Sequence, residues 1–415
     1  MLRRLPDDLR GLARLATDAT VGTADLVEAL HAQIGTRLGR DGTGRRRGIS
    51  GFVYRTVRQV ARASGWSGEA ALLPLARLVR EAHDAPTSAR REALVAVLNG
   101  VLGDGLAATG NPLAIEMRLR RGGVALDLTT EALAAAIPDA SPHVLVLVHG
   151  LCMNDRQWTT ASGHDHGAAL EREAGYTAVY LHYNTGLHIS TNGHAFSALL
   201  DGLVASWPVP VQSLSILCHS MGGLVARSAC AVAEADGHTW RPRLRRLVFL
   251  GTPHHGSPLE RRGNGLDRLL LRTRWTAPFA RVGRLRSAGI TDLRYGSLLD
   301  EDWRWRDRFE ARPDGRRAVP LPPGVEAYTV AATRARRAGS ALDRLVGDGL
   351  VPIASAVGRH ADPAHALAFP SDHQHVATGV HHFALLGAAV YPLLLRWLAP
   401  AARDGGPAES RAAER

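Results

Sequence analysis

The spacing of apolar residues along the chain changes near residue 112. Between residues 7 and 104, four segments place apolar residues three and four positions apart, which is the spacing of amphipathic helices. From residue 112 onward, short apolar runs alternate with helical patterns. This change predicts a helical N-terminal extension over residues 1–110 and a larger strand-and-helix domain over residues 111–400. We expect residues 401–415 to form a disordered tail.

Seven short runs in the larger domain predict β-strands. They cover residues 114–120, 123–128, 143–150, 177–184, 214–220, 245–253 and 325–332. The first two form a predicted hairpin, joined by Arg121 and Gly122. The later runs are almost continuously apolar, as expected for parallel strands covered by helices on both faces. The sequence therefore predicts an α/β fold with a mostly parallel central sheet, and ligand chemistry at the carboxyl ends of its strands.

Two further segments of the larger domain have distinct patterns. Residues 256–320 form a long insertion between predicted strands, which favours a lid over the site or, alternatively, a solvated surface excursion. Residues 383–395 form the longest apolar stretch, which is too short to span a bilayer. We predict a buried terminal helix there.

Charge is unevenly distributed along the chain. All 50 basic residues are arginine; residues 1–110 contain 16 of them against 11 acids, and residues 256–340 contain 18 against 10. Such basic surfaces are compatible with two interpretations: peripheral contact with an anionic membrane surface, or simple solubility. The arginines are scattered, without a recognition motif or interleaved aromatic residues, which argues against nucleic acid as a partner.

Cysteine content and the N-terminus bear on the compartment. The cysteines, Cys152, Cys218 and Cys230, are few and odd in number, so no disulfide framework is indicated. The N-terminal segment has early acidic residues and no apolar run of signal-peptide length. We expect a cytoplasmic protein with reduced cysteines. Peripheral contact with a membrane surface is compatible with this expectation.

Ser220 lies where an apolar strand runs directly into a helix, in the segment LSILCHSMGGLVARSA. A sharp strand-to-helix turn of this kind holds a serine hydroxyl above the sheet, beside the helix N-terminus. Small residues two positions before and two positions after the serine let the turn close. Gly222 stands at the later position, whereas Cys218 stands at the earlier one, where the pattern has glycine. We predict that Ser220 is a nucleophile.

A nucleophilic serine needs backbone N–H donors that face the oxyanion developing on its substrate. We expect the first donor to be the amide of Met221, directly after the nucleophile. The second is the amide of Leu151, directly after His149 and Gly150, which end the strand at residues 143–150. His149 itself is interpreted as structural.

The acid of a catalytic triad should follow a later strand. Asp348 does so, and Gly347 and Gly349 on either side of it allow a tight turn. Asp343 is the local alternative. The order along the chain, serine then acid then histidine, supports Asp348.

Four histidines beyond this acid are candidate bases: His373, His375, His381 and His382. We select His382, because the segment HFALL is expected to start the terminal helix and to set the imidazole on the adjoining loop. His381 is the alternative.

No metal or cofactor is predicted. His164 and His166 flank Asp165, and His373 and His375 lie two positions apart, but neither pair has the further ligands that a zinc site requires. The chain has no lysine and no glycine-rich phosphate-binding loop.

Five motifs in order, VHGL, HSMGG, GTPHHGSP, DGLVP and HFALL, resemble the lipase and GPI inositol-deacylase-like branch of the α/β-hydrolases. The resemblance covers roughly residues 112–400. It implies an α/β-hydrolase catalytic domain that hydrolyses carboxylic esters of lipid-like alcohols, a role in lipid metabolism, and Ser220, Asp348 and His382 in the triad positions. The helical extension and much of the insertion have no counterpart in it.

We therefore expect a serine esterase or lipase that works through an acyl-enzyme. A thioesterase or acyltransferase with the same triad is an alternative within enzymes. A non-catalytic scaffold that binds a membrane or a partner through its basic segments is the alternative outside them.

Overall fold

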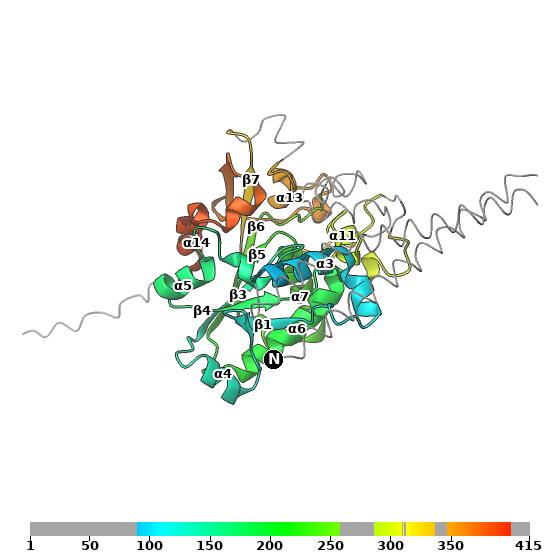
Figure 1. Ribbon diagram of the computed structural model, residues 1–415. Helices are drawn as coiled ribbons and strands as arrows, with labels where there is room; N and C mark the ends of the chain where they lie inside the picture. Colours follow the sequence, from blue (N-terminus) through cyan, green and yellow to red (C-terminus); the bar gives the residue numbers. More distant parts are fainter. Residues whose placement is uncertain (1–88, 258–285, 309, 311–312, 337–346, 400–415) are drawn as a thin grey trace, which may run out of the picture.

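A central β-sheet organises the computed structural model, which describes residues 89–257, 286–308, 310, 313–336 and 347–399 (Figure 1). The strand order is β2-β1-β4-β3-β5-β6-β7-β8. The strands are β1 (Arg118–Arg121), β2 (Val124–Ala125), β3 (His143–Val148), β4 (Thr177–His182), β5 (Ser213–His219), β6 (Leu244–Leu250), β7 (Glu326–Thr333) and β8 (Gln374–Thr378). The predicted helices before residue 89, the first part of the insertion and the C-terminal tail lie outside the described residues.

The pairing of the strands separates a parallel block from an antiparallel hairpin. Strands β4, β3, β5, β6, β7 and β8 pair in parallel, whereas β1 runs antiparallel to both β4 and β2. The predicted hairpin is therefore present. Its turn lies one residue later than expected, at Gly122 and Gly123, because their φ angles of 57° and 78° are ones that glycine adopts without strain.

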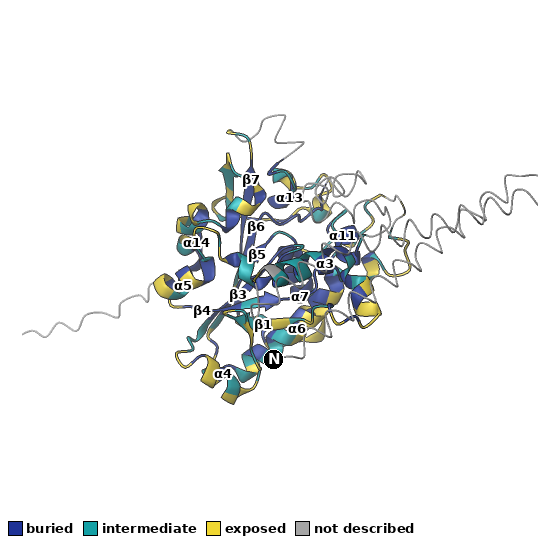
Figure 2. Cartoon of the chain, in the orientation of Figure 1, coloured by how far each residue is buried: buried dark blue, intermediate teal, exposed yellow. Residues whose placement is uncertain are grey.

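Helices cover both faces of the sheet. The helices are α3 (Ala89–Ala108), α4 (Thr130–Ala136), α5 (His166–Ala174), α6 (Ile189–Ser206), α7 (Gly222–Asp236), α11 (Ala288–Asp292), α13 (Ile353–Ala356) and α14 (Tyr391–Leu398). Alternate residues of β3 point to opposite faces: Val146 belongs to the core under α6 and α7, and Leu147 to the core under α5 and α14. The sheet is buried between these helices, and their outer faces are exposed (Figure 2). This is the predicted architecture, the α/β-hydrolase fold.

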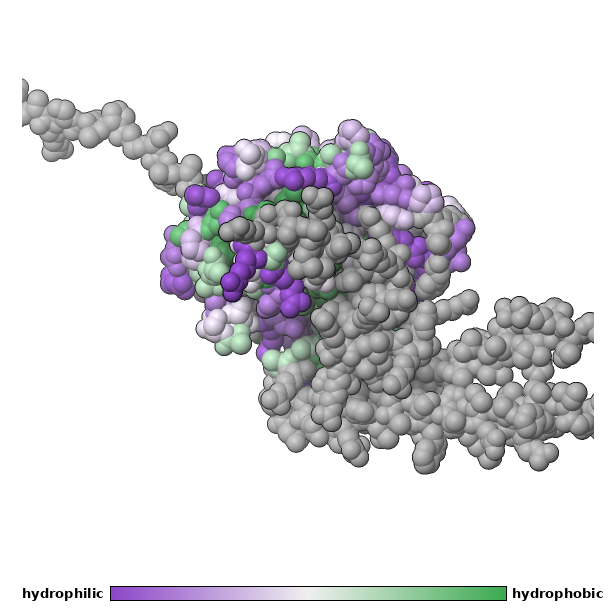
Figure 3. All heavy atoms as spheres, turned by 90° about the horizontal axis from the view of Figure 1, so that it is seen from above, coloured by the Kyte–Doolittle hydropathy of each residue, from purple (hydrophilic) through white to green (hydrophobic). Residues whose placement is uncertain are grey.

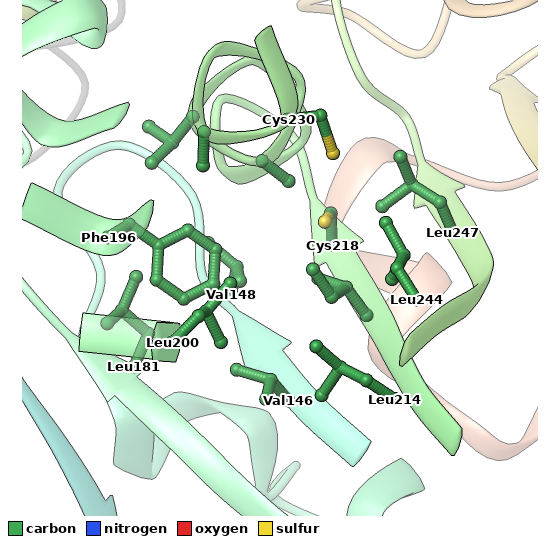
Figure 4. Packing of buried hydrophobic residues seen from close by; sticks show 14 of the residues in the cluster. Val146, Val148, Leu181, Phe196, Leu200, Leu214, Cys218, Cys230, Leu244 and Leu247 are labelled. Atoms are coloured by element: carbon green, nitrogen blue, oxygen red, sulfur yellow. The ribbon is translucent and has the colours of Figure 1, made fainter. Parts of the chain in front are cut away.

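The layer between β5 and α7 lies directly beneath the turn that carries Ser220. Figure 4 shows Cys218 on β5 and Cys230 on α7 within the same apolar cluster as Val146, Val148 and Phe196. Both thiols are buried and free. The pKa of the Cys218 thiol is raised well above its ordinary value by burial, so the residue behaves as a small neutral core side chain.

In the C-terminal region, one element was not predicted and one prediction was wrong. Strand β8 was not predicted, and residues 383–395 do not form one helix. The segment HFALL is a 3-10 turn, His382–Leu386, followed by a second 3-10 turn at Ala388–Val390, and only then does α14 begin at Tyr391. Gly387, with extended backbone between the turns, and Pro392, in the first turn of α14, explain the break.

The visible surface of the described part is mixed. In the view from above, hydrophilic residues cover most of it, and hydrophobic residues occur in small groups between them (Figure 3). No helix among the described residues is long and apolar enough to cross a membrane.

Candidate active site

Ser220 occupies a sharp turn between β5 and α7. Its φ angle is 55°, a left-handed conformation that a non-glycine residue adopts at a cost. The turn is fixed by two hydrogen bonds: the Ser220 amide donates to the Leu250 carbonyl at 2.8 Å, and the Gly223 amide donates to the Ser220 carbonyl at 3.1 Å. The local geometry is thus the strained strand-to-helix elbow that the sequence pattern predicts.

Glycine at position 222 is required by close backbone packing. A methyl group there would lie 2.4 Å from the Val148 carbonyl oxygen and 2.6 Å from that of His149. Helix α7 therefore begins in contact with the end of β3. Cys218, at the other end of the motif, is fully buried, so its side chain fits beneath the turn without opening it.

Asp348 and His382 lie together in the interior. The His382 Nδ1 is 2.6 Å from the Asp348 Oδ2, and the side chains are 3% and 1% exposed, respectively. The other carboxylate oxygen, Oδ1, accepts hydrogen bonds from the amides of Leu350 at 2.9 Å and Val351 at 2.8 Å. Both oxygens are satisfied, so the carboxylate is held in one orientation behind the imidazole.

The turn that holds Asp348 uses the glycines on both sides of it. Gly347 and Gly349 have φ angles of 50° and 102°, and a methyl group on Gly347 would lie 2.1 Å from the Val351 carbonyl oxygen. Only glycine adopts the second of these conformations readily. The alternative acid, Asp343, lies outside the described residues.

His382 lies close to the carboxyl ends of β5 and β6. A methyl group on Gly251, the residue after β6, would lie 2.9 Å from His382 Cε1. The ring centroids of His219 and His382 are 4.7 Å apart, and His219 directly precedes Ser220. The His382 Nε2 atom is buried and has no hydrogen-bond partner among the described residues. In this conformation the Ser220 hydroxyl is not hydrogen-bonded to it.

The other candidate histidines lie elsewhere. His381 is exposed, just before the 3-10 turn, and within the described structure the imidazole that bonds to Asp348 is that of His382. His373 bonds to the Ala327 carbonyl at 3.1 Å and stacks on Tyr328. Both partners lie near the start of β7, so His373 is at the amino-terminal end of the parallel strands, away from Ser220. His375 lies on β8 itself.

The expected oxyanion donors border the Ser220 turn. A methyl group on Gly150 would lie 2.9 Å from the Ser220 Cβ, so the loop after β3 packs directly on the elbow. Neither the Leu151 amide nor the Met221 amide donates a hydrogen bond to any described residue. These two N–H groups are therefore available to a ligand oxygen in front of the serine.

Buried neutral histidines surround the elbow. Burial lowers the pKa of His149 to about 3, and its ring stacks on Tyr183 at 4.5 Å. The pKa of His219 lies well below its ordinary value because of burial and the neighbouring His382. Both therefore stay uncharged at neutral pH and contribute packing around the site. The sequence reasoning did not single out His219, since nothing in its spacing distinguishes it from a core residue.

Phe383 was also not recognised from sequence. It follows His382, is 49% exposed, and its ring centroid lies 5.6 Å from that of His382. The expectation of a buried helix concealed it. An exposed aromatic side chain beside the buried imidazole gives the site an apolar border.

The other histidine pairs have structural partners. Asp165 caps α5 by accepting from the amides of Gly167 and Ala168, and His166 bonds to the Leu385 carbonyl at 3.0 Å. In the described parts of the chain, no group of three or more histidine, cysteine or acidic residues is placed to hold a metal ion.

Comparisons with known proteins give one family model that matches part of the chain, and solved structures of low sequence identity. A family model described as a domain of unknown function, DUF7379, matches residues 123–287, a span that includes Leu151 and Ser220 but neither Asp348 nor His382. No curated protein matches the chain.

Three solved structures illustrate the level of structural similarity. Lipase BlEst2 from Bacillus licheniformis, in its mature form, is 19% identical over 69% of this chain and 98% of that chain, with a TM-score of 0.41. Phospholipase PlaB from Legionella pneumophila is 16% identical over 52% of this chain and 45% of that chain, with a TM-score of 0.32. The Pyrococcus furiosus esterase Pf2001 is 12% identical over 62% and 78%, with a TM-score of 0.34. At these identities and TM-scores the matches carry no information about the reaction of this chain.

Proposed function

We propose that the protein is a serine hydrolase that cleaves carboxylic esters through an acyl-enzyme, with Ser220, His382 and Asp348 as its triad. The observation that supports this most strongly is the buried hydrogen bond between Asp348 and His382. It occupies Nδ1 of the imidazole and leaves Nε2 unpartnered near the strained elbow that carries Ser220. An imidazole held in this way accepts a proton on Nε2 while the carboxylate stabilises the resulting cation.

The proposed reaction proceeds in two acyl-transfer steps. His382 Nε2 takes the proton of the Ser220 hydroxyl as the serine oxygen bonds to the ester carbonyl carbon. The amides of Leu151 and Met221 donate to the oxyanion so formed. Collapse of this intermediate breaks the ester C–O bond, and the proton on Nε2 passes to the leaving alkoxide. Water, deprotonated by His382, then attacks the acyl-enzyme and releases the acid and the free serine.

The side of the site formed by Phe383 favours an apolar substrate. An aromatic side chain that is 49% exposed beside the proposed base offers contact to an acyl or alkyl chain. Together with the resemblance to lipases and GPI inositol-deacylase-like enzymes, this supports lipid-like esters as the substrate class. We propose peripheral contact with an anionic membrane surface through the basic segments as the route to such substrates.

An activated alkyl phosphonate probe tests the nucleophile. It should label the wild-type protein and the control variant Ser162→Ala, whose serine lies in an exposed turn, but not Ser220→Ala. Hydrolysis of nitrophenyl esters of graded chain length should disappear in the same variant. Labelling that persists in Ser220→Ala would refute the nucleophile.

The same assays separate the alternatives. Faster turnover of acyl thioesters, or transfer of the acyl group to an added alcohol in place of water, would favour a thioesterase or an acyltransferase. Flotation with anionic liposomes in the absence of any labelling would favour the non-catalytic scaffold.

A further inference from the structure

The loop that carries the Leu151 amide contains a strained residue. Residues 150–153 form a turn in which the Met153 amide donates to the Gly150 carbonyl at 3.3 Å. Cys152, at the third position of the turn, has a φ angle of 60°. A non-glycine residue keeps such a conformation only where its surroundings enforce it. The contacts of Cys152 therefore determine where the neighbouring Leu151 amide points.

One of these contacts comes from the loop after β4. The Cys152 amide donates to the Thr185 hydroxyl at 3.2 Å, and Thr185 is almost fully buried. Because the Cys152 amide is used here, the Leu151 amide is left as the free donor of the turn.

Helix α3 presses on the same residue from the other side. A methyl group on Gly100 would lie 2.3 Å from the Cys152 Sγ and 3.0 Å from its Cα. One turn further along the same face, a methyl group on Gly103 would lie 1.9 Å from the Asn184 Oδ1. Glycine weakens a helix interior. Its use at both positions therefore fits a need for the helix backbone to approach Cys152 and Asn184 closely. Gly105 differs, since nothing lies within 4 Å of a methyl group placed there.

Helix α11 of the insertion completes the support. Ile290 forms an apolar cluster with Val101 of α3, and Leu151 and Cys152 pack against this cluster. The Ser287 hydroxyl donates to the Gly100 carbonyl at 2.6 Å. The turn at residues 150–153, here called the oxyanion loop, is thus packed between a helix that precedes the sheet domain and a helix of the insertion. Figure 1 shows α3 and α11 side by side, on the right of the described ribbon.

We propose that helix α3 is a positioning element of the active site, which holds the Leu151 N–H toward the oxyanion through the contact of Gly100 with Cys152. The proposal rests on the proposed ester-hydrolase function. It gives the last part of the N-terminal extension a role in catalysis, although α3 contains none of the reacting groups. Gly100, Cys152 and Thr185 are then positioning residues, which act through the Leu151 amide.

The central experiment compares Gly100→Ala with Gly105→Ala in the full-length chain. Gly100→Ala should lower kcat for a nitrophenyl ester by about 10- to 100-fold with KM within about twofold, because the misplaced donor acts only on the transition state. The inhibition constant of phenylboronic acid, whose tetrahedral serine adduct puts an oxygen in the same position, should rise in parallel. Gly105→Ala should keep wild-type values. Rates are normalised to the active serine concentration by phosphonate titration, which removes the effect of any unfolded fraction.

A compensating variant tests the contact itself. In a Cys152→Gly background the Sγ that would lie 2.3 Å from the new methyl group is absent and glycine accepts the positive φ angle, whereas the contact with the Cα at 3.0 Å remains. There, the loss of kcat caused by Gly100→Ala should be several-fold smaller than in the wild-type background, a coupling that additive structural damage does not produce. Thr185→Val removes the hydroxyl that accepts from the Cys152 amide and leaves α3 unchanged. It should lower kcat several-fold with KM unchanged, and it keeps the proposal testable if Gly100→Ala does not fold.

The outcomes distinguish this proposal from the one on which it rests. Wild-type kcat and boronate affinity in titrated Gly100→Ala, or an equal loss in the Cys152→Gly background, would overturn the role of α3 and leave the esterase proposal standing. A wild-type protein that neither hydrolyses esters nor is labelled at Ser220 would remove both.

Discussion

At the scale of single residues, the charge of Asp348 is the most direct test of the triad. Asp348→Asn keeps the shape and the two backbone hydrogen bonds to Oδ1 but removes the charge that stabilises protonated His382. We expect kcat for ester hydrolysis to fall by about 10³- to 10⁴-fold with little change in stability. Asp372→Asn, whose side chain is 81% exposed, is the control and should retain wild-type kcat. Full activity in Asp348→Asn would transfer the role of the acid to another residue.

The residues of the candidate site differ in how far the sequence alone could predict them. Ser220 lies where an apolar strand runs into a helix, a local pattern that predicts a functional hydroxyl. Asp348 was selected by the glycines on both sides of it and by the order of serine, acid and histidine along the chain. The left-handed conformation of Cys152 could not be predicted, because it depends on contacts with α3 and the loop after β4, which are distant in sequence. The preference for His382 over His381 rested on an expected helix that is absent, although His382 is the residue that reaches Asp348.

At the scale of elements, buried apolar strands were predicted well and irregular or polar elements were not. Strands β3 to β7 are runs of apolar residues buried on both faces, which leaves little ambiguity. Strand β8, with the sequence QHVAT, is an edge strand in which no residue is fully buried, so it lacks that signal. The break at Gly387 combines with Pro392 to interrupt a segment whose apolar residues alone favoured one helix.

An ion-pair network attaches α3 to the sheet, and its strength can be measured. Arg120 on β1 lies 3.3 Å from Glu92 of α3 and 3.2 Å from Asp155, and Asp155 is 3% exposed. Arg120→Met removes one cation and leaves both carboxylates short of a partner. We expect the free energy of unfolding to fall by about 2 to 3 kcal/mol, somewhat less than for a fully broken buried pair because Arg156 and His182 remain.

Arg118→Met is the matched control on the same strand. Its side chain is 55% exposed and pairs with an exposed Glu116. Loss of such a surface pair should change stability by less than about 0.5 kcal/mol. Urea denaturation of both variants measures the difference, and equal midpoints would show that the buried network contributes no more than the surface pair.

At the scale of the whole molecule, the described core contains several histidines that must stay neutral. The pKa values of His149, His166, His219, His254 and His255 all lie below the ordinary value, with burial as the largest cause in each. In the unfolded chain these groups take up protons near pH 6.5, whereas in the folded protein His166 does so only near pH 4 and His149 near pH 3. The unfolded state therefore binds more protons in this window, and stability falls as the pH decreases from about 6.5 toward 4.

The contribution of one such histidine can be isolated. Each group that titrates only in the unfolded state adds up to about 1.4 kcal/mol per pH unit to the slope of stability against pH. His149→Gln should therefore lower the slope of the urea-derived stability between pH 6 and 4.5 by about that amount, whatever its effect on stability at pH 7. Ser162→Ala, which removes no titrating group from an exposed turn, should leave the slope unchanged. If His149→Gln also kept the wild-type slope, His149 would have to gain its proton in the folded state as readily as in the unfolded chain. Water would then have to reach the imidazole, either directly or through local opening of the oxyanion loop.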